Sequence, residues 1–300
     1  MHCGFCGEEE APGRLLVRGP EAAICGECAE RARAILLPPE VAPAAGGERP
    51  RARAPPSRPV AVIPARYAST RFPGKPLARL GGKTMIEHVV DRCRESGAFS
   101  DILVATDDAR IALAVRGFGA EVVMTSESCV SGTDRVAEVA AESAGKVFIN
   151  VQGDEPLVHP EALAQLASVF EDPAVPMATL VRPLQDDERD NPHVVKAVLA
   201  KSGDALYFSR ADLPFERGPQ ARVLRYAHVG LYGYRRETLV KLASLAPTPL
   251  ERSESLEQLR ALEHGIRIRC VISSHRSLGV DTPEDLVRAE AEWSRRPPSP

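Results

Sequence analysis

From residue 60 onward, short apolar runs alternate with longer stretches in which apolar residues recur at helical spacing. The short runs, rich in β-branched residues, predict strands at 60–63, 102–105, 121–124 and 147–151. The amphipathic stretches predict helices at 84–97, 109–117 and 133–143. Strands and helices that alternate in this way predict an α/β fold with a doubly wound, mostly parallel, Rossmann-like sheet and right-handed crossovers.

The pattern changes between about residues 176 and 235, where strand-like runs follow one another more closely. These runs are 178–181, 194–200, 205–208 and 228–233. They predict a smaller β-rich subdomain, which we expect to lie over the crevice at the carboxyl ends of the main strands.

The first part of the chain has a different character. Residues 38–58 are rich in Pro, Ala and Arg and contain almost no large apolar residue, which is typical of an extended, semi-rigid linker. We therefore expect a small module at 1–37, a main domain at 59–293, and a disordered tail at 294–300.

Composition excludes several classes of protein. The 300 residues are 44% hydrophobic and carry a formal net charge of only −3, so a general nucleic-acid binder, which should be basic, is not expected. No apolar run is long enough for a membrane span, and the N-terminus lacks the pattern of a secretory signal. We expect a soluble, cytoplasmic protein.

The cysteines are concentrated near the N-terminus. Two Cys-x2-Cys pairs lie eighteen residues apart, and they are Cys3, Cys6, Cys25 and Cys28. In a reducing compartment this spacing favours four thiolates on one tetrahedral Zn²⁺ over a pair of disulfides. Four protein ligands leave no open position, so a structural site is expected. We expect Cys93, Cys129 and Cys270 to be buried or incidental.

The strand at 60–63 leads directly into a loop of cations and small residues. Arg66, Arg71 and Lys75 are separated by residues such as Ser69 and Gly74. Ligands of α/β sheets lie beyond the carboxyl ends of strands, and Arg forks and Lys ammonium groups bind phosphates strongly. The pattern indicates a polyphosphate site, although a solvated basic loop would have the same charges.

Two acidic motifs also follow predicted strands or precede predicted helices. Asp154 and Glu155 come after the run at 147–151, and Asp281 precedes a helix that opens at Thr282. Carboxylates in such places can hold Mg²⁺ against phosphate oxygens. Alternatively, Asp281 caps the helix and Asp154 belongs to an ordinary turn.

Seven motifs, in order, resemble the 3-deoxy-manno-octulosonate (Kdo) cytidylyltransferases, also called CMP-Kdo synthetases. The likeness spans about residues 59–293. The motifs are Pro64-Ala-Arg-Tyr-Ala-Ser-Thr-Arg-Phe-Pro-Gly-Lys-Pro-Leu77, Ser131-Gly-Thr-Asp-Arg135, Val151-Gln-Gly-Asp-Glu-Pro156, Tyr207-Phe-Ser-Arg210, His228-Val-Gly-Leu-Tyr-Gly-Tyr234, Leu256-Glu-Gln-Leu-Arg260 and Gly279-Val-Asp-Thr-Pro-Glu-Asp285. Residues 3–37, with Cys-Gly-Phe-Cys-Gly and Ile-Cys-Gly-Glu-Cys, are similar to the zinc-binding domain of the ClpX unfoldase.

The first resemblance implies transfer of CMP from CTP to the anomeric hydroxyl of Kdo for lipopolysaccharide synthesis, with pyrophosphate released. It implies that Asp154 and Asp281 hold Mg²⁺ and that Arg66 and Lys75 complete the catalytic group. The implied CTP-binding residues are Ala65, Arg66, Ser69, Arg71, Lys75, Ser131, Gly132, Thr133, Arg135 and Gln152. The implied Kdo-binding residues are Arg210, His228, Tyr232, Glu257 and Gln258.

Other interpretations of some of these residues stay open. Ser131 to Thr133 could simply begin a helix, and His228 alone would more often be structural. The segment 214–225 is shorter than in many relatives, which leaves open how the sugar site closes.

The resemblances also imply partners. The synthetase likeness implies a homodimer, and the ClpX likeness implies a module that dimerises or docks proteins, although its apolar residues could instead cover only its own core. The competing functions are CMP transfer to another acid sugar, such as 8-amino-Kdo or sialic acid, and a zinc adapter with an inactive transferase domain.

Overall fold

The computed structural model describes the backbone at 16–18 and 23–25 and residues 58–69, 71–218, 223–276 and 278–295. Its contacts divide the chain into two units, Met1–Arg53 and Ala54–Pro300. In the first unit, β1 (Leu16–Arg18) and β2 (Ala23–Cys25) pair as antiparallel strands. The predicted zinc ligation by four cysteine side chains, almost all of the linker and most of the tail lie outside the described residues.

The second unit is built on a nine-stranded sheet. Seven of its strands follow the order β11 (Ala205–Ser209), β10 (Lys196–Leu199), β12 (Tyr226–Arg235), β8 (Val147–Asn150), β3 (Val60–Pro64), β6 (Asp101–Thr106) and β7 (Glu121–Met124), while β9 (Met177–Pro183) pairs with β12 and β13 (Ile268–Ile272) pairs with β9. Four of these strands run parallel to one another, and they are β3 (Val60–Pro64), β6 (Asp101–Thr106), β7 (Glu121–Met124) and β8 (Val147–Asn150). Each strand predicted between residues 60 and 151 is present within one residue at either end. The doubly wound α/β fold is confirmed.

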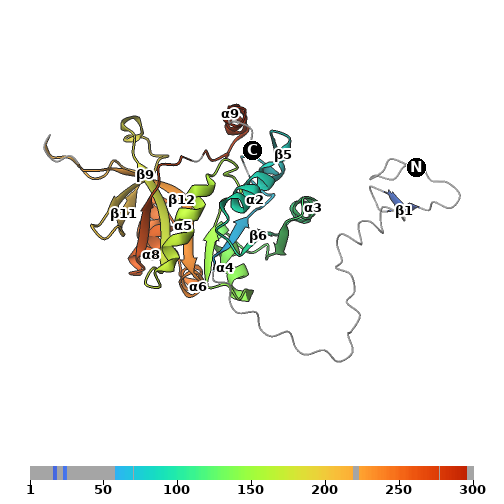
Figure 1. Cartoon of the computed structure of the whole chain (residues 1–300), viewed down its shortest axis with the longest axis horizontal. Helices are drawn as coiled ribbons and strands as arrows, with labels where there is room; N and C mark the ends of the chain where they lie inside the picture. The colour runs from blue at the N-terminus through green and yellow to red at the C-terminus, as the bar shows by residue number, and fades with distance from the viewer. Residues whose placement is uncertain are drawn as a thin grey trace, which may run out of the picture. The chain divides into compact units, whose positions relative to one another are not determined.

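Helices cover both faces of the sheet (Figure 1). The helices are α2 (Met85–Ser96), α3 (Ala109–Gly117), α4 (Gly132–Glu142), α5 (Pro160–Ser168), α6 (Arg236–Ser244), α7 (Pro249–Glu254), α8 (Gln258–Glu263) and α9 (Pro283–Trp293). Because side chains of a strand alternate between faces, Ala61 and Ile63 pack with residues of α2 and α5, whereas Val60 and Val62 pack with residues of α4 and α6. All four side chains are buried, as expected for a central strand.

The strand-rich region predicted after residue 176 is also present. Its strands, together with one that the sequence did not reveal, are β9 (Met177–Pro183), β10 (Lys196–Leu199), β11 (Ala205–Ser209), β12 (Tyr226–Arg235) and β13 (Ile268–Ile272). These strands extend the main sheet and do not form a layer over it. The reason is the length of β12, whose C-terminal half pairs with β8 while its N-terminal half pairs with β10, with a register shift between Val229 and Tyr232 against β9.

Among the residues that the structure describes, there is no helix whose length and apolar character would suit a membrane crossing. Outside the helices and strands, the connections that follow β3 and β8 and the segment before α9 meet at one end of the parallel strands.

Candidate active site

The basic loop after β3 has a defined backbone conformation. Gly74 has a φ of 71°, which favours glycine, and its N–H donates to the Tyr67 carbonyl at 3.0 Å. The Ser69 hydroxyl accepts a hydrogen bond from the Phe72 N–H at 3.3 Å. The Arg110 guanidinium stacks on the ring of Tyr67, 3.3 Å from its centroid. The loop is therefore held by specific contacts and is not merely a solvated basic segment.

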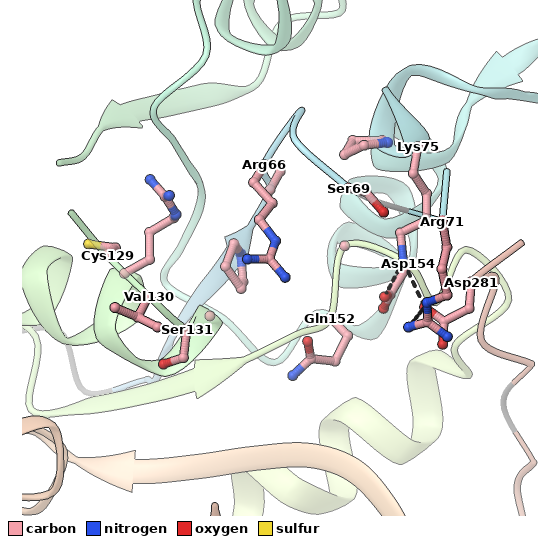
Figure 2. A pocket seen from close by; sticks show the side chains of 16 residues that line it. Arg66, Ser69, Arg71, Lys75, Cys129, Val130, Ser131, Gln152, Asp154 and Asp281 are labelled. Carbon is pink, nitrogen blue, oxygen red and sulfur yellow. Dashed lines mark hydrogen bonds and ion pairs between the residues drawn. The ribbon is translucent and has the colours of Figure 1, made fainter. Parts of the chain in front are cut away.

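Lys75 joins the two acidic motifs. Its ammonium lies 2.7 Å from Oδ2 of Asp154 and 3.1 Å from Oδ1 of Asp281, and Arg71 contacts the same Asp281 oxygen at 3.2 Å (Figure 2). The Lys75 side chain is 14% exposed, whereas those of Asp154 and Asp281 are 33% and 48% exposed. Two carboxylates from distant parts of the chain thus converge on one cation at the mouth of a pocket.

Asp281 is positioned by its neighbours and does not cap α9. The cap is Thr282, whose hydroxyl accepts from the Asp285 N–H while the Asp285 carboxylate accepts from the Thr282 N–H. The alternative that Asp281 is the cap is therefore wrong. In addition, the Val280 N–H donates to the Asp154 carbonyl at 2.9 Å, which ties the two acidic segments together.

Gly153 explains how closely the loops after β3 and β8 approach. A Cβ at this position would lie 2.8 Å from the Pro64 carbonyl oxygen, which is too close for any side chain. Since the contact is with backbone, a rotamer change would not relieve it. The Gly-Asp pair therefore allows Asp154 to lie directly beside the basic loop after β3.

A cavity of about 240 Å³ opens at this junction (Figure 2). Nine of the ten residues expected to bind CTP, and both acidic residues, line it. Its lining residues are Pro64, Ala65, Arg66, Ser69, Arg71, Lys75, Pro76, Cys129, Val130, Ser131, Gly132, Arg135, Gln152, Gly153, Asp154 and Asp281. Thr133 is the one residue of the ten that does not line the cavity.

Arg135 and Thr133 interact with other side chains of the protein, whereas the sequence predicted that both bind CTP. The Arg135 guanidinium donates to the Asp107 carboxylate at 2.7 Å and to the Thr125 hydroxyl, so its charge is already neutralised within the protein. Thr133 does not line the cavity, because it is buried and its side chain bonds Tyr234 and Glu257. A direct contact of either residue with nucleotide remains a prediction.

The sequence did not single out Cys129, Val130 or Gly153 as lining residues. Cys129 and Val130 directly precede the motif that begins at Ser131, and Gly153 lies within the motif 151–156, so their places along the chain could have suggested them. Cys129 is half-buried, and burial raises the pKa of its thiol to about 11; the hydrogen bond from this thiol to Glu138, at 3.1 Å, acts in the same direction. Ser131 forms a capping box with Asp134 and so begins α4, and it also lines the cavity; its contact with CTP stays a prediction.

A second group of polar side chains lies on β12, beside the cavity. Gln152 connects the two places, because its Nε2 donates to the Gly230 carbonyl at 3.3 Å. The rings of His228 and Tyr232 lie 5.2 Å apart, and Nε2 of His228 is 3.0 Å from the Thr179 hydroxyl. Burial lowers the pKa of His228 to about 4, so the ring is neutral at pH 7.

The remaining residues expected to bind Kdo lie at the start of α8 and just after β11. Burial raises the pKa of Glu257, which is bonded to Thr133, and Nε2 of Gln258 is buried without a hydrogen bond among the described residues. The Arg210 guanidinium donates to the backbone carbonyls of Glu254 and Pro192 at 2.8 and 2.9 Å. A role for Arg210 in binding a sugar carboxylate requires it to exchange these partners, and it stays a prediction.

A doubly wound sheet with clustered cations and paired carboxylates beyond its parallel strands defines the class of nucleotidyltransferases. The sequence model described as "Cytidylyltransferase" matches residues 60–268, and that described as "ClpX C4-type zinc finger" matches residues 1–37. The second match supports a structural zinc site in the N-terminal module.

Sequence relatives show to which family of nucleotidyltransferases the chain belongs. A 3-deoxy-manno-octulosonate cytidylyltransferase of Myxococcus xanthus (strain DK1622) is 61% identical over 235 residues, which cover 78% of this chain and 96% of the relative. The enzyme of the same name from Geobacter sulfurreducens (strain ATCC 51573 / DSM 12127 / PCA) is 53% identical over 245 residues, covering 76% and 96%. The chain belongs to the 3-deoxy-manno-octulosonate cytidylyltransferase family.

Two solved structures are similar to this chain in fold, and one of them also in sequence. The structure of CMP:2-keto-3-deoxy-manno-octonic acid synthetase complexed with CTP superposes with a TM-score of 0.76 at 41% identity, covering 80% of this chain and 99% of the other. A 4-diphosphocytidyl-2C-methyl-D-erythritol synthase from Anaerococcus prevotii DSM 20548 has a TM-score of 0.54 at 11% identity, covering 79% and 99%, and shares the fold alone.

Proposed function

We propose that this protein transfers CMP from CTP to the anomeric hydroxyl of Kdo and releases pyrophosphate. The observation that carries the proposal is the group formed by Lys75, Asp154 and Asp281 at the carboxyl ends of β3 and β8, within a chain that is 61% identical to an enzyme named for this reaction. The product serves lipopolysaccharide inner-core synthesis.

The basic loop supplies the positive charge that the reaction needs. When the sugar hydroxyl attacks the α-phosphorus, its oxygen forms the new P–O bond, the hydroxyl proton passes to solvent, and the bond from the α-phosphorus to pyrophosphate breaks. Negative charge grows on the phosphoryl oxygens and on the leaving group. Arg66, Arg71 and Lys75 stand where that charge develops, so they act by positioning and electrostatic stabilisation. No protein nucleophile is required.

Asp154 and Asp281 fit a divalent cation. Their oxygens already converge on a single positive group, the Lys75 ammonium, and both carboxylates are partly exposed at the cavity. Oxygen ligands of this kind suit Mg²⁺, which keeps several of its waters and binds phosphate at the same time. Bound there, Mg²⁺ would neutralise phosphate charge and lower the pKa of the sugar hydroxyl. With the carboxylates on the metal, Lys75 can donate to phosphate oxygens.

The wall formed by His228, Tyr232 and Gln258 is the proposed sugar side. His228 is neutral, so it contributes a hydrogen bond and not a charge, and the buried amide of Gln258 has an unused donor. Buried polar groups without partners are costly, and a ligand rich in hydroxyl groups would satisfy them. This arrangement supports a polyhydroxylated sugar as the second substrate.

The test is pyrophosphate release by the full chain with CTP, Mg²⁺ and Kdo. We expect release that depends on all three and is lost in Asp154→Ala and in Asp281→Ala. Release with 8-amino-Kdo or sialic acid but not with Kdo would redirect the proposal to another acid sugar. No release with any acid sugar would leave the adapter function.

We also propose a homodimer, a cytoplasmic location, and a protein-docking role for the N-terminal module. The family resemblance supports the dimer, thiolate zinc ligands suit a reducing compartment, and a ClpX-type finger separated by a linker suits docking. Light scattering of the full chain tests the dimer. Deletion of residues 1–58 should leave turnover unchanged and abolish capture of partner proteins; unchanged capture would contradict the docking role.

A further inference from the structure

Two histidines and a glutamate meet outside the cavity described above. His159, Glu161 and His275 each present a possible ligand atom, and these atoms all lie within 4.8 Å of one another. The imidazole rings are stacked with centroids 4.4 Å apart, and Nδ1 of His159 is 3.8 Å from Oε2 of Glu161. Within the described residues, no other group of three such side chains is this close.

The backbone brings these residues together from distant segments. His159 is the residue before α5, where Pro160 begins the helix, and its ring makes no capping hydrogen bond. Glu161 follows in the first turn. His275 lies just beyond β13, where the Ser273 N–H donates to the Val181 carbonyl at 2.8 Å and the Ser273 hydroxyl accepts from the His275 N–H at 3.3 Å. His159 is therefore placed by the start of α5, and His275 by these hydrogen bonds just beyond β13.

The donor set and its spacing suit a transition metal. Zn²⁺ binds imidazole nitrogen and carboxylate oxygen at about 2.0–2.2 Å, so two ligands of a tetrahedral ion lie roughly 3.3 Å apart. The observed spacing needs only small side-chain rotations, and the Glu161 side chain, which is 66% exposed, can make them readily. Two imidazoles are poor ligands for Mg²⁺, which prefers oxygen, so this group is chemically distinct from Asp154 and Asp281.

We propose that His159, Glu161 and His275 form a site for Zn²⁺ or a similar transition-metal ion, with water completing the coordination. The site joins the same two segments that carry the acidic pair. His159 lies five residues after Asp154, and His275 lies six residues before Asp281. The bound ion acts as a clamp between these segments, in addition to the hydrogen bond from the Val280 N–H to the Asp154 carbonyl. The site does not depend on the proposed reaction.

Metal content tests the site directly. The full chain is equilibrated with micromolar ZnCl₂ at pH 7.5, gel-filtered and measured by mass spectrometry, beside His159→Gln/His275→Gln and the control His264→Gln, which changes an exposed histidine elsewhere. Zinc held by the N-terminal cysteines is common to all three proteins and cancels in the difference. We expect the wild type and the control to hold about one more zinc per chain than the double variant.

Equal zinc content in the three proteins would overturn the proposal. Should the double variant fail to fold, Glu161→Gln provides the second test, because its side chain is exposed and its loss does not disturb the core. That variant should bind the second zinc at least about tenfold more weakly in a chelator competition, since even the loss of a group that supports a ligand costs this much. An unchanged affinity would show that Glu161 is not a ligand. ZnCl₂ should also raise the Tm of the wild type more than that of the double variant.

Discussion

The polar side chains of the cavity beside β3 and those of the wall on β12 differ in charge and in burial. Around Lys75, the charged side chains lie near the surface and form ion pairs with one another. Solvation and ion pairing therefore stabilise these charges in the absence of a ligand. On β12, the His228 and Tyr232 side chains are partly buried, and this burial lowers the pKa of the histidine and raises that of the tyrosine. The comparison teaches that the cavity holds charged groups, which suit the proposed transfer reaction, whereas the wall holds neutral hydrogen-bonding groups, which suit the proposed recognition of a sugar.

The largest effect should come from the charged region. Lys75→Met removes a cation aimed at the charge that develops on phosphate, and the loss of one such group lowers kcat by about 10² to 10³. We expect kcat/KM for CTP to fall by this factor while the free energy of unfolding changes little, because the remaining carboxylates are partly solvated. The control Lys146→Met, at an exposed lysine, should keep full activity. Equal activity of Lys75→Met and Lys146→Met would contradict the proposed role of the charged cavity.

The next largest effect should be the dependence of folding stability on pH that comes from the partly buried His228. His228 has a folded pKa of about 4 against an ordinary 6.5, so the unfolded state binds more protons between these values. Stability should therefore be complete above pH 6.5 and fall as the pH drops toward 4, by roughly 3 kcal/mol in total.

Urea unfolding at several pH values measures this slope. His88, whose pKa burial also lowers, contributes in the same direction, so the readout is the difference between proteins. The slope should be smaller in His228→Gln and unchanged in His264→Gln. A slope that His228→Gln leaves intact would show that the ring is not held neutral by burial.

A third effect tests how closely the two loops of the cavity approach. Gly153→Ala places a Cβ 2.8 Å from the Pro64 carbonyl oxygen, and the forced backbone shift should cost about 1–3 kcal/mol of stability and lower activity. Gly132→Ala is the matched control, since its Cβ would lie 3.3 Å from the flexible ring of the same proline. Thermal unfolding should place the control near the wild type; similar losses in both variants would contradict the argument.

The smallest expected effect is a difference in stability and in KM for Kdo between variants of Tyr232 and Tyr234 on β12. The Tyr234 hydroxyl bonds Thr133, so Tyr234→Phe should cost about 1 kcal/mol. The Tyr232 hydroxyl is buried without a hydrogen bond of ordinary geometry among the described residues, because the nearby Thr179 hydroxyl is engaged with His228 and two carbonyls. Tyr232→Phe should therefore cost only a few tenths of a kcal/mol and yet raise the KM for Kdo. A matching KM in both variants would remove Tyr232 from the sugar side.

Particular elements show where prediction from sequence succeeded. The strand at 60–63 and the helices near 84–97 and 109–117 were predicted within a few residues, because apolar spacing reports directly which face of an element is buried. By contrast, β13 and helices α5 to α8 were not predicted. The place of β12 between β8, β9 and β10 could not be read from its composition either, since pairing depends on partners far along the chain.

The sequence by itself determined the alternating elements, the cations of the basic loop and the chemical types of the site residues, because these depend on local spacing and on side-chain chemistry. Only the tertiary structure decided which charges meet. It paired Lys75 with Asp154 and Asp281, engaged Arg135 with Asp107, and made Thr282 the cap that leaves Asp281 facing the cavity. The physical reason is that ion pairing and burial act through distances in space, which long-range strand order sets.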